Sequence, residues 1–392
     1  MSKKQQIHVV VVGGGFGGVK TALELANKRN VLVTLISQGM NFEYHGALYR
    51  TATGRSPMEV VIPLREIFRK ARNVSVVLDS VTKIDPGMKR LESEMGSIYS
   101  YDKVVFAMGN VTNYFGIEGM EQNTVAMTTV SNTMVLRHKL IALLRSKKET
   151  VRIAVIGGGA SGVELVAELP YFAELVAKKD KRPLKKLELT LIEGSGRVLP
   201  LLNEKASAIA QKHLTKQGVA LRLNTRVNAC EPGKVCVSGR DVHADLIVWT
   251  AGSRVVDFYA NHPEVFTLEH GKVKVDSFLR PTGHKDIFVI GDNALTKYSG
   301  MAQTAIHDAK FVARNLIALT KGQTHKLYRA RKPIYVVTIG PNWAVVQSGD
   351  KVVSGKAGWR VRRKADLWIF QNFEPYKKAV KTWRKGGKVA KF

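Results

Sequence analysis

The sequence predicts an α/β fold with two parallel-sheet units, followed by an amphipathic helical region at the C-terminus. Two apolar runs, VVVVGGGFGGVK at residues 9–20 and AVIGGGASGVEL at residues 154–165, pass through glycines into helical patterns. The end of the chain instead combines aromatic and cationic residues. With 392 residues, the chain is long enough for two or three domains that each bury a core.

The first glycine turn follows a β-branched run at residues 7–12, which is typical of a strand buried on both faces. Gly13, Gly15 and Gly18 fit the spacing G-x-G-x-x-G, in which the backbone approaches a pyrophosphate and a helix packs closely on a strand. A helical pattern and the strand at residues 31–37 complete a βαβ unit. Ser37 occupies the position where an acidic residue normally binds the ribose. We therefore expect that part of the nucleotide to be bound less tightly or in a different way.

The second glycine turn repeats this arrangement with Gly157, Gly159 and Gly162. The strand LELTLIE, which follows its helix, ends at Glu193. A carboxylate there would hydrogen-bond a ribose 2′-hydroxyl and repel a 2′-phosphate, which favours NADH over NADPH. The alternative is a solvated glutamate at a strand end.

Two dinucleotide turns in one chain imply two different dinucleotides, because two copies of NAD would accomplish nothing obvious. FAD together with NADH makes a hydride relay. The sequence therefore predicts two Rossmann-like dinucleotide-binding domains, with the FAD domain interrupted by the NADH domain. We expect the FAD domain at residues 1–148 and 278–332, the NADH domain at 149–277, and a strand pair with basic amphipathic helices at 333–392.

A further strand-end residue is predicted to face the first cofactor. The stretch DIFVIGD places Asp292 at the C-terminal end of a strand, which is where open α/β sheets bind the polar groups of their ligands. The alternative role for this aspartate is to cap a helix.

The charge of the chain favours an anionic partner. Subtracting 32 acidic from 61 basic residues gives +29, and residues 351–392 hold 13 basic against two acidic residues. The electric field of a protein with this positive charge attracts nucleic acid or an anionic membrane surface. No apolar stretch reaches the ~18–20 residues that span a bilayer, so we expect a cytoplasmic chain that does not cross a membrane.

The tail is predicted to form amphipathic helices, one of them beginning at Pro375. The apolar residues at helical spacing are Tyr376, Ala379, Val380 and Trp383 in that helix, and Val361, Ala365, Trp368 and Ile369 in an upstream helix. Aromatic residues beside lysine and arginine suit a helix that lies in the headgroup region of a membrane. The alternatives are packing on the protein itself or on a partner subunit, and binding of nucleic acid.

The two cysteines, Cys230 and Cys236, cannot form a disulfide framework, and no group of Cys and His has metal-binding spacing. We therefore expect no metal site and a reducing compartment. The stretch CEPGKVC predicts a hairpin around its Pro-Gly turn.

These motifs resemble those of the two-dinucleotide-binding flavoprotein oxidoreductases, and within that class the chain is similar to the type II NADH dehydrogenases. Members of that family are single-subunit enzymes that pass electrons from NADH through FAD to a membrane quinone without pumping protons. The similarity covers nearly the whole chain. It is carried by both glycine turns and by LYRTATG at 48–54, YDKVVFAMGNVTNYFGIEG at 101–119, TLIEGSGRVLP at 190–200, VWTAGS at 248–253, FVIGDNAL at 288–295 and MAQTAIHDAKFVARNL at 301–316.

The resemblance implies which residues bind the two cofactors. For FAD they are Gly13, Gly14, Gly15, Phe16, Gly17, Gly18, Ser37, Ala107, Met108, Gly109, Gly291, Asp292, Ala302, Gln303 and Thr304. For NADH they are Gly157, Gly159, Gly162, Glu193 and Gly252.

The resemblance also implies three catalytic residues. Glu164 matches a glutamate that the family uses near the flavin in hydride transfer and quinone reduction; from the residues alone, it is an acid in the first turn of a helix. Gln303 matches the first glutamine of the family's A-Q-x-A-x-Q-x-G segment, at the quinone face of the flavin. His307 and Ala309 replace the later glutamine and glycine of that segment. His307 is therefore either a proton donor to the quinone or an ordinary helix-surface histidine.

The partners implied by the resemblance are a membrane quinone, an anionic lipid surface bound through residues 356–392 at the cytoplasmic face, and a second copy of the chain. No cysteine lies in residues 1–229, which argues against thiol-based disulfide reduction. Two rival functions are reduction of a soluble carrier of ferredoxin or rubredoxin type, and nucleic-acid binding like that of apoptosis-inducing factors. The clustering of charge in the tail and the AQTA segment make nucleic acid the weaker alternative.

Overall fold

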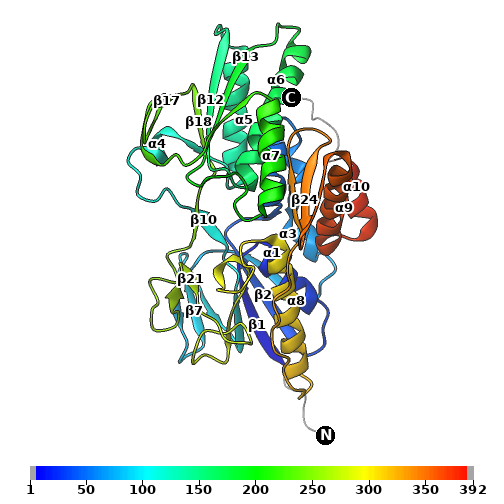
Figure 1. The fold of residues 1–392 in the computed structure, drawn as a ribbon. Helices are drawn as coiled ribbons and strands as arrows, with labels where there is room; N and C mark the ends of the chain where they lie inside the picture. The colour runs from blue at the N-terminus through cyan, green and yellow to red at the C-terminus, as the bar shows by residue number, and fades with distance from the viewer. Residues whose placement is uncertain (1–5, 386–392) are drawn as a thin grey trace.

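The computed structural model of the chain describes residues 6–385. Two five-stranded sheets, each covered by helices, lie one above the other, and the C-terminal segment runs along one side of both (Figure 1). The predicted α/β fold with two parallel-sheet units is thereby confirmed.

The first sheet has the strand order β22-β9-β1-β2-β5, and all its pairings are parallel. Its strands are β1 (Ile7–Val12), β2 (Val31–Ser37), β5 (Val74–Leu78), β9 (Lys103–Phe106) and β22 (Ile287–Val289). Helix α1 (Phe16–Leu25) connects β1 to β2 and packs against α8 (Ala302–Leu319). Residues from distant parts of the sequence thus share this sheet, because the chain leaves it after β9 and returns at β22.

The second sheet has the order β11-β18-β12-β13-β14 and is also parallel. Its strands are β11 (Val125–Ala126), β12 (Thr150–Ile156), β13 (Lys186–Ile192), β14 (Val219–Arg222) and β18 (Leu246–Trp249). Its helices are α5 (Val130–Arg145), α6 (Ala160–Asp180) and α7 (Glu204–Lys216). An antiparallel ribbon of β10 (Asn110–Thr112) and β19 (Ser253–Val255) lies where the chain enters and leaves this unit.

Short elements complete both units. In the first unit they are β3 (Asn41–Glu43), η1 (His45–Ala47), α2 (Leu48–Ala52), η2 (Pro57–Glu59), β4 (Val61–Pro63), α3 (Leu64–Phe68), β6 (Val81–Asp85), β7 (Arg90–Ser93), β8 (Ile98–Ser100), β20 (Leu268–Glu269), β21 (Lys272–Val273) and η3 (Gly291–Asn293). In the second they are α4 (Met120–Asn123), β15 (Val227–Glu231), β16 (Lys234–Val237) and β17 (Val242–His243). Strands β15 and β16 confirm the predicted hairpin, and Cys230 and Cys236 on it are free thiols.

The C-terminal segment is a three-stranded antiparallel sheet followed by two helices. A third strand, β25 (Lys351–Ser354), joins the predicted pair β23 (Tyr335–Thr338) and β24 (Ala344–Ser348). Helices α9 (Gly355–Phe373) and α10 (Tyr376–Lys385) lie where two helices are predicted. Within residues 6–385, none of the helices has the length and apolar character needed to cross a membrane.

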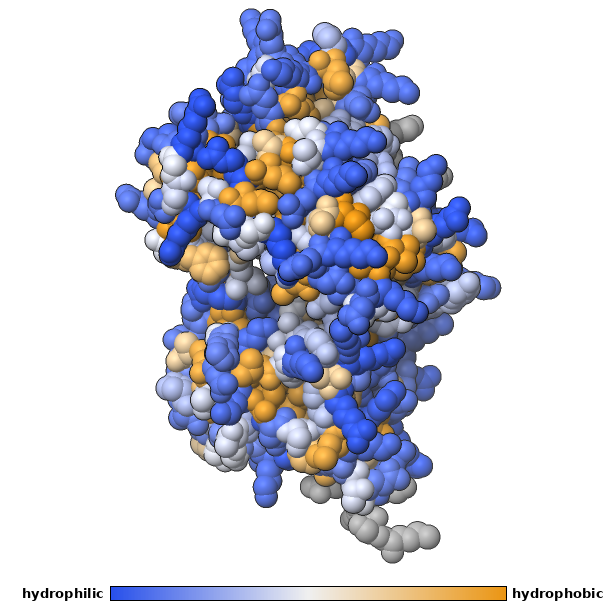
Figure 2. Space-filling view, in the orientation of Figure 1, coloured by the Kyte–Doolittle hydropathy of each residue, from blue (hydrophilic) through white to orange (hydrophobic). Residues whose placement is uncertain are grey.

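The apolar side of α10 packs on α9 rather than facing outward. Ala379 has no exposed surface, and the Trp383 indole donates a hydrogen bond to the Arg363 carbonyl at 2.7 Å. The Arg363 guanidinium lies 4.7 Å from the centre of the same ring. Tyr376 and Trp368 stay exposed. Figure 2 shows that hydrophilic side chains cover much of the visible face, with apolar side chains scattered between them. Much of the amphipathic pattern of α10 is therefore explained by packing within the chain.

A buried network of charges holds α9 against both sheet units. Asp366 has no exposed surface and accepts hydrogen bonds from Arg362 at 3.0 Å, Arg50 at 2.7 Å and Tyr44 at 2.9 Å. Arg362 also donates to Glu164 of α6 at 2.7 Å. Burial alone would raise the pKa of Asp366, but the two arginines and the hydrogen bonds outweigh it and hold the pKa at about 2. Arg50 thus ties α9 to the first unit, and Glu164 ties it to the second.

We expect Asp366→Asn to lower the free energy of unfolding by about 3–5 kcal/mol, because two buried arginines lose the carboxylate that compensates them. Denaturant titration with a tertiary-structure probe measures this. The matched control is Asp257→Asn, which breaks an exposed pair with Arg254 and should change the midpoint little. Equal effects of the two substitutions would contradict the structural importance given to the buried network.

Candidate functional site

The two glycine turns have the same local geometry, in which a helix begins directly on a strand. A Cβ at Gly18 would lie 1.9 Å from the Gly13 carbonyl oxygen, and a Cβ at Gly162 would lie 2.0 Å from the Gly157 carbonyl oxygen. Only glycine therefore allows α1 and α6 to approach their strands this closely. These contacts explain the third glycine of each predicted motif.

The middle position of each turn is open. A Cβ at Gly15 or at Gly159 would meet no atom within 4 Å, and these two residues are the N-caps of α1 and α6. Neither helix has an acidic residue in its first turn. Free amide groups and the helix dipole then favour an anion, so both turns fit the pyrophosphate of a dinucleotide.

Ser37 and Glu193 occupy equivalent places beside the two turns. Glu193 accepts hydrogen bonds from Gly158 N at 2.6 Å and from the backbone and hydroxyl of Ser195 at 2.8 and 2.7 Å. A carboxylate has about four acceptor sites, so at least one is left for a ribose hydroxyl. The Ser37 hydroxyl instead donates to the Gly39 carbonyl at 2.7 Å, which uses its single hydrogen. Ser37 can offer a ribose only an acceptor lone pair.

Asp292 lies half-buried at the carboxyl end of the first sheet, as predicted. Burial raises the pKa of its carboxyl group, and the positive charges of Lys272 and His45 oppose that shift without reversing it. The Asn110 amide lies 3.4 Å from the carboxylate. Lys272 supplies positive charge from β21, and the sequence pattern gave no signal for it.

Asn293, beside Asp292, fixes the loop at Gly109. Its side chain is fully buried, accepts from Gly109 N at 3.0 Å and donates to Gly109 O at 2.6 Å. The Tyr259 hydroxyl donates to the same amide oxygen at 3.0 Å. The predicted residues Ala107, Met108 and Gly109 therefore adjoin Asp292 because of an asparagine that the sequence reasoning missed. Its place directly after GD in FVIGDN was the available signal.

Asp308 of α8 holds the turn before Asp292. It accepts a hydrogen bond from Gly291 N at 3.0 Å and another from the Tyr328 hydroxyl at 2.6 Å. Burial raises the pKa of Asp308 to about 6, although both hydrogen bonds lower it. The helical residue Asp308 thus positions Gly291 and, through it, Asp292.

Phe16 is part of an aromatic cluster that connects the first turn to the end of α9. Its ring centre lies 5.0 Å from that of Phe42 and 5.7 Å from that of Phe373, both in edge-on geometry. Gly17 faces Ala107 and Ile290 across the turn. Phe16 and Gly17 therefore shape the first turn through packing.

Gly252 lies at the entrance to the second turn, under Phe115. A Cβ at Gly252 would lie 2.5 Å from the Phe115 ring, and Gly252 O accepts from Asn113 N at 3.1 Å. Phe115 is 60% exposed, which is high for a ring beside a predicted nucleotide site. The sequence reasoning did not single out Phe115.

Glu164 lies just past the first turn of α6, not within it as the sequence indicates, and it is buried. Its Oε1 accepts from Arg362 at 2.7 Å and from the Thr338 backbone and hydroxyl at 3.2 and 3.1 Å. Burial raises the pKa of Glu164, while Arg362 and the Thr338 hydrogen bonds counteract part of this effect. Glu164 thus contacts the C-terminal segment, and its partner Arg362 lies 198 positions further along the chain.

Gln303 and His307 lie one turn apart on α8 and face the segment that leads into β23. The Gln303 amide forms two hydrogen bonds with the backbone of Ile334, at 2.8 and 3.2 Å. The His307 Nε2 donates to the Arg329 carbonyl at 2.9 Å. Thr304 is buried and donates to Tyr298 O at 2.6 Å. Gln303 and Glu164 hold opposite ends of one stretch, because Ile334 and Thr338 are four residues apart.

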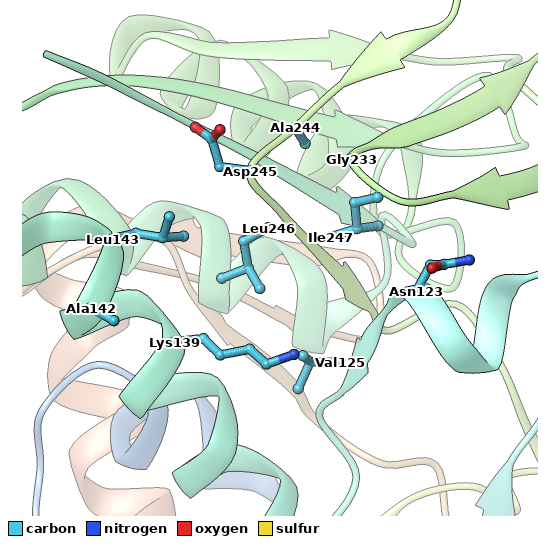
Figure 3. A pocket seen from close by; sticks show the side chains of 10 residues that line it. All are labelled: Asn123, Val125, Lys139, Ala142, Leu143, Gly233, Ala244, Asp245, Leu246 and Ile247. Carbon is cyan, nitrogen blue, oxygen red and sulfur yellow. The ribbon is translucent and has the colours of Figure 1, made fainter. Parts of the chain in front are cut away.

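A cavity of about 420 Å³, shown in Figure 3, is lined by no residue of either glycine turn. Its walls come from α4, α5 and the start of β18, and Lys139, Leu143 and Leu246 are among the residues that form them. None of the predicted site residues lines it. In the described part of the chain, no group of three or more His, Cys, Asp or Glu residues could hold a metal ion.

We expect Gly15→Ala and Gly18→Ala to separate cofactor binding from folding. Gly15→Ala should leave the unfolding midpoint near wild type but lower the flavin bound per chain, because its methyl stands where a phosphate approaches. Gly18→Ala should lower bound flavin and also cost about 1–3 kcal/mol of stability through overpacking. Flavin absorbance and denaturant titration give the two readouts. Full flavin content in Gly15→Ala would contradict the assigned phosphate position.

Comparisons with known proteins agree with this geometry. The family model of the pyridine nucleotide-disulphide oxidoreductases matches residues 7–309. The type II NADH:quinone oxidoreductase Ndh of Mycobacterium tuberculosis is 28% identical over 90% of this chain and 82% of its own length. The type II NADH:quinone oxidoreductase of Staphylococcus epidermidis is 29% identical over 89% of this chain and 91% of its own length.

Solved structures share the fold. NDH2 from Plasmodium falciparum in complex with NADH superimposes with a TM-score of 0.84 at 17% identity and covers 98% of both chains. The sulfide:quinone oxidoreductase of Aquifex aeolicus gives a TM-score of 0.80 at 22% identity and covers 95% of this chain and 94% of its own. Since the family model covers well over half of the sequence, the chain belongs to the pyridine nucleotide-disulphide oxidoreductase family.

Proposed function

We propose that the chain is a non-proton-pumping NADH:quinone oxidoreductase of type II, which passes a hydride from NADH to FAD and two electrons on to a membrane quinone. The observation that carries this proposal is the pair of open glycine turns in one chain, with a free acceptor site on Glu193 beside the second. The curated relatives, whose names give this activity, support it.

The chemistry that FAD supplies when bound is acceptance of a hydride and release of two electrons. The amide ends of α1 and α6 would hold the two pyrophosphates, and Asp292 would accept hydrogen bonds from FAD hydroxyls. Glu193 would hold the adenosine ribose of NADH, and Gly252 with Phe115 would border the nicotinamide half. The remaining predicted cofactor residues would shape the two turns around these contacts.

Glu164, Gln303 and His307 are the proposed catalytic residues. Glu164 is buried, so it would take up a proton at a higher pH than an exposed glutamate does. The Gln303 amide is oriented by Ile334 and would form part of the quinone side of the site. His307 Nε2 carries a hydrogen toward Arg329 O, so proton donation to a quinone would need the charged imidazolium with Nδ1–H.

Docking on an anionic lipid surface through residues 356–392 belongs to the same proposal. Val361 and Trp368 are exposed on α9, and Tyr376 is exposed on α10 among lysines. Exposed aromatic rings beside cations suit the headgroup region. Ile369 is buried, so the apolar contribution of α9 is smaller than its sequence pattern indicates; residues 386–392 lie outside the described part. The proposed location is peripheral, at the cytoplasmic face of a membrane. The proposed domain boundaries are those predicted from the sequence, after residues 148, 277 and 332.

The test follows the flavin spectrum without oxygen. NADH should bleach the yellow protein, and a short-chain quinone should restore the absorbance at once. Bleaching without reoxidation by the quinone would overturn the quinone assignment, and a soluble carrier protein would then be the acceptor to test.

We expect Glu193→Gln to raise the Kd for NADH about 10- to 100-fold, because hydrogen bonds to a charged group contribute about 1.5–3 kcal/mol. The preference for NADH over NADPH should fall at the same time, since the charge that repels a 2′-phosphate is gone. Stopped-flow bleaching at varied nucleotide concentration measures both. The matched control is Glu188→Gln, on the exposed part of the same strand, which should behave like wild type.

A further inference from the structure

Four cations gather where α1, α8 and the segment before β23 come together. They are Lys20 on α1, Lys310 and Arg314 on α8, and Arg331 in the connecting segment. Helices α1 and α8 pack side by side over the first sheet (Figure 1). One carboxylate, that of Glu24, is among the charges that act on Lys310. Four cations and one anion leave a local charge of +3.

Lys20 is the most deeply buried of these four cations. Its side chain is 10% exposed, and its Nζ lies 2.8 Å from Glu24 Oε1. The same ammonium donates to the Asn372 carbonyl at 3.3 Å, near the C-terminal end of α9, where the helix dipole favours a cation. Lys20 is therefore already paired with Glu24, the carboxylate that acts on Lys310.

The other three cations form no ion pair with the residues that the structure describes. Lys310 is half-buried, and Arg314 and Arg331 are exposed. Within residues 6–385, no hydrogen bond or ion pair joins the side chain of any of the three to the protein. Burial lowers the pKa of Lys310, and the charges of Lys20, Arg314 and Arg331 lower it further. Like charges four residues apart on a helix destabilise it, so the cluster stores repulsion that a bound anion would relieve.

An exposed tryptophan lies on α9, one helical turn before the residue that Lys20 contacts. The Asn372 side chain, one turn further along α9, donates to Trp368 O at 2.8 Å, and Lys20 binds the carbonyl of the same Asn372. Trp368 is 41% exposed. Tryptophan is enriched at membrane interfaces, where its ring lies at the level of the headgroups.

We propose that a site formed by Lys310, Arg314 and Arg331, beside the buried Lys20, binds the phosphate of an anionic lipid headgroup. The proposal rests on the membrane docking described above and gives that docking a specific phosphate site. Lysine and arginine side chains together offer several N–H donors that match phosphate oxygens. It also extends the lipid-binding surface beyond residues 356–392 to α1 and α8.

The experiment is co-sedimentation of the flavin-loaded full chain with vesicles of phosphatidylcholine alone or in equal amounts with phosphatidylglycerol. We expect wild type to bind the anionic vesicles, and Lys310→Gln/Arg314→Gln to bind them about 25-fold more weakly, because each cation near the surface contributes about a factor of five. The variant should keep its flavin, NADH turnover with a water-soluble quinone, and wild-type or higher thermal stability, since it relieves repulsion.

The control variant Lys147→Gln/Lys181→Gln removes two exposed lysines at the distant end of the second unit, near the C-terminal ends of α5 and α6. It should bind anionic vesicles almost as wild type does. Equal losses in both double variants would show attraction by net charge alone and overturn the site. Wild-type binding by Lys310→Gln/Arg314→Gln would also overturn it while leaving membrane docking intact. No binding by wild type would overturn the docking itself.

Inorganic phosphate separates a headgroup from a free anion. We expect phosphate to raise the thermal midpoint of wild type only slightly and to displace anionic vesicles only at high concentration. If phosphate strongly stabilises wild type but not the double variant, and vesicle binding is unchanged between the two, the site takes free phosphate and the lipid assignment is wrong.

Discussion

The buried ion network around Arg362 and Asp366 is the constraint on which the arrangement of the molecule depends. Arg50 and Arg362 both donate to Asp366, which has no solvent contact, and Arg362 also donates to the buried Glu164. Each would be costly to bury alone. The network is stable only when the first unit, the second unit and α9 are all in place, so the relative position of the two glycine turns is coupled to the C-terminal segment.

This coupling also brings the proposed catalytic residues into one region. Glu164 and Gln303 come from different units, yet they bind Thr338 and Ile334 at the two ends of one short stretch. The stretch is continuous with β23, which packs beside α9. Helix α9 is therefore connected to Glu164 and Gln303 through directly contacting neighbours.

The two dinucleotide units show how similar backbones acquire different ribose chemistry. In both units the third glycine lies so close to the carbonyl oxygen of the first glycine that a Cβ would clash with it. A helix can begin this close to its strand only where the residue has no side chain. The residue at the end of the next strand differs between the two units. Glu193 has an unused acceptor site, whereas the Ser37 hydroxyl donates its only hydrogen to the Gly39 carbonyl. Asn293 and Asp308 then stabilise the far side of the first turn through contacts with Gly109 and Gly291.

The sequence by itself determined the two parallel-sheet units, the hairpin at Cys230 and the C-terminal helices, because glycine spacing, β-branched runs and apolar periodicity are local properties of the chain. It also placed Asp292 and Glu193 at strand ends. Only the tertiary structure decided that part of the apolar side of α10 packs against α9, that Arg362 is the partner of Glu164, and that Lys310 lies among other cations. Those outcomes depend on which residues meet across long sequence separations, and one chain's pattern of residue types does not encode its contact partners.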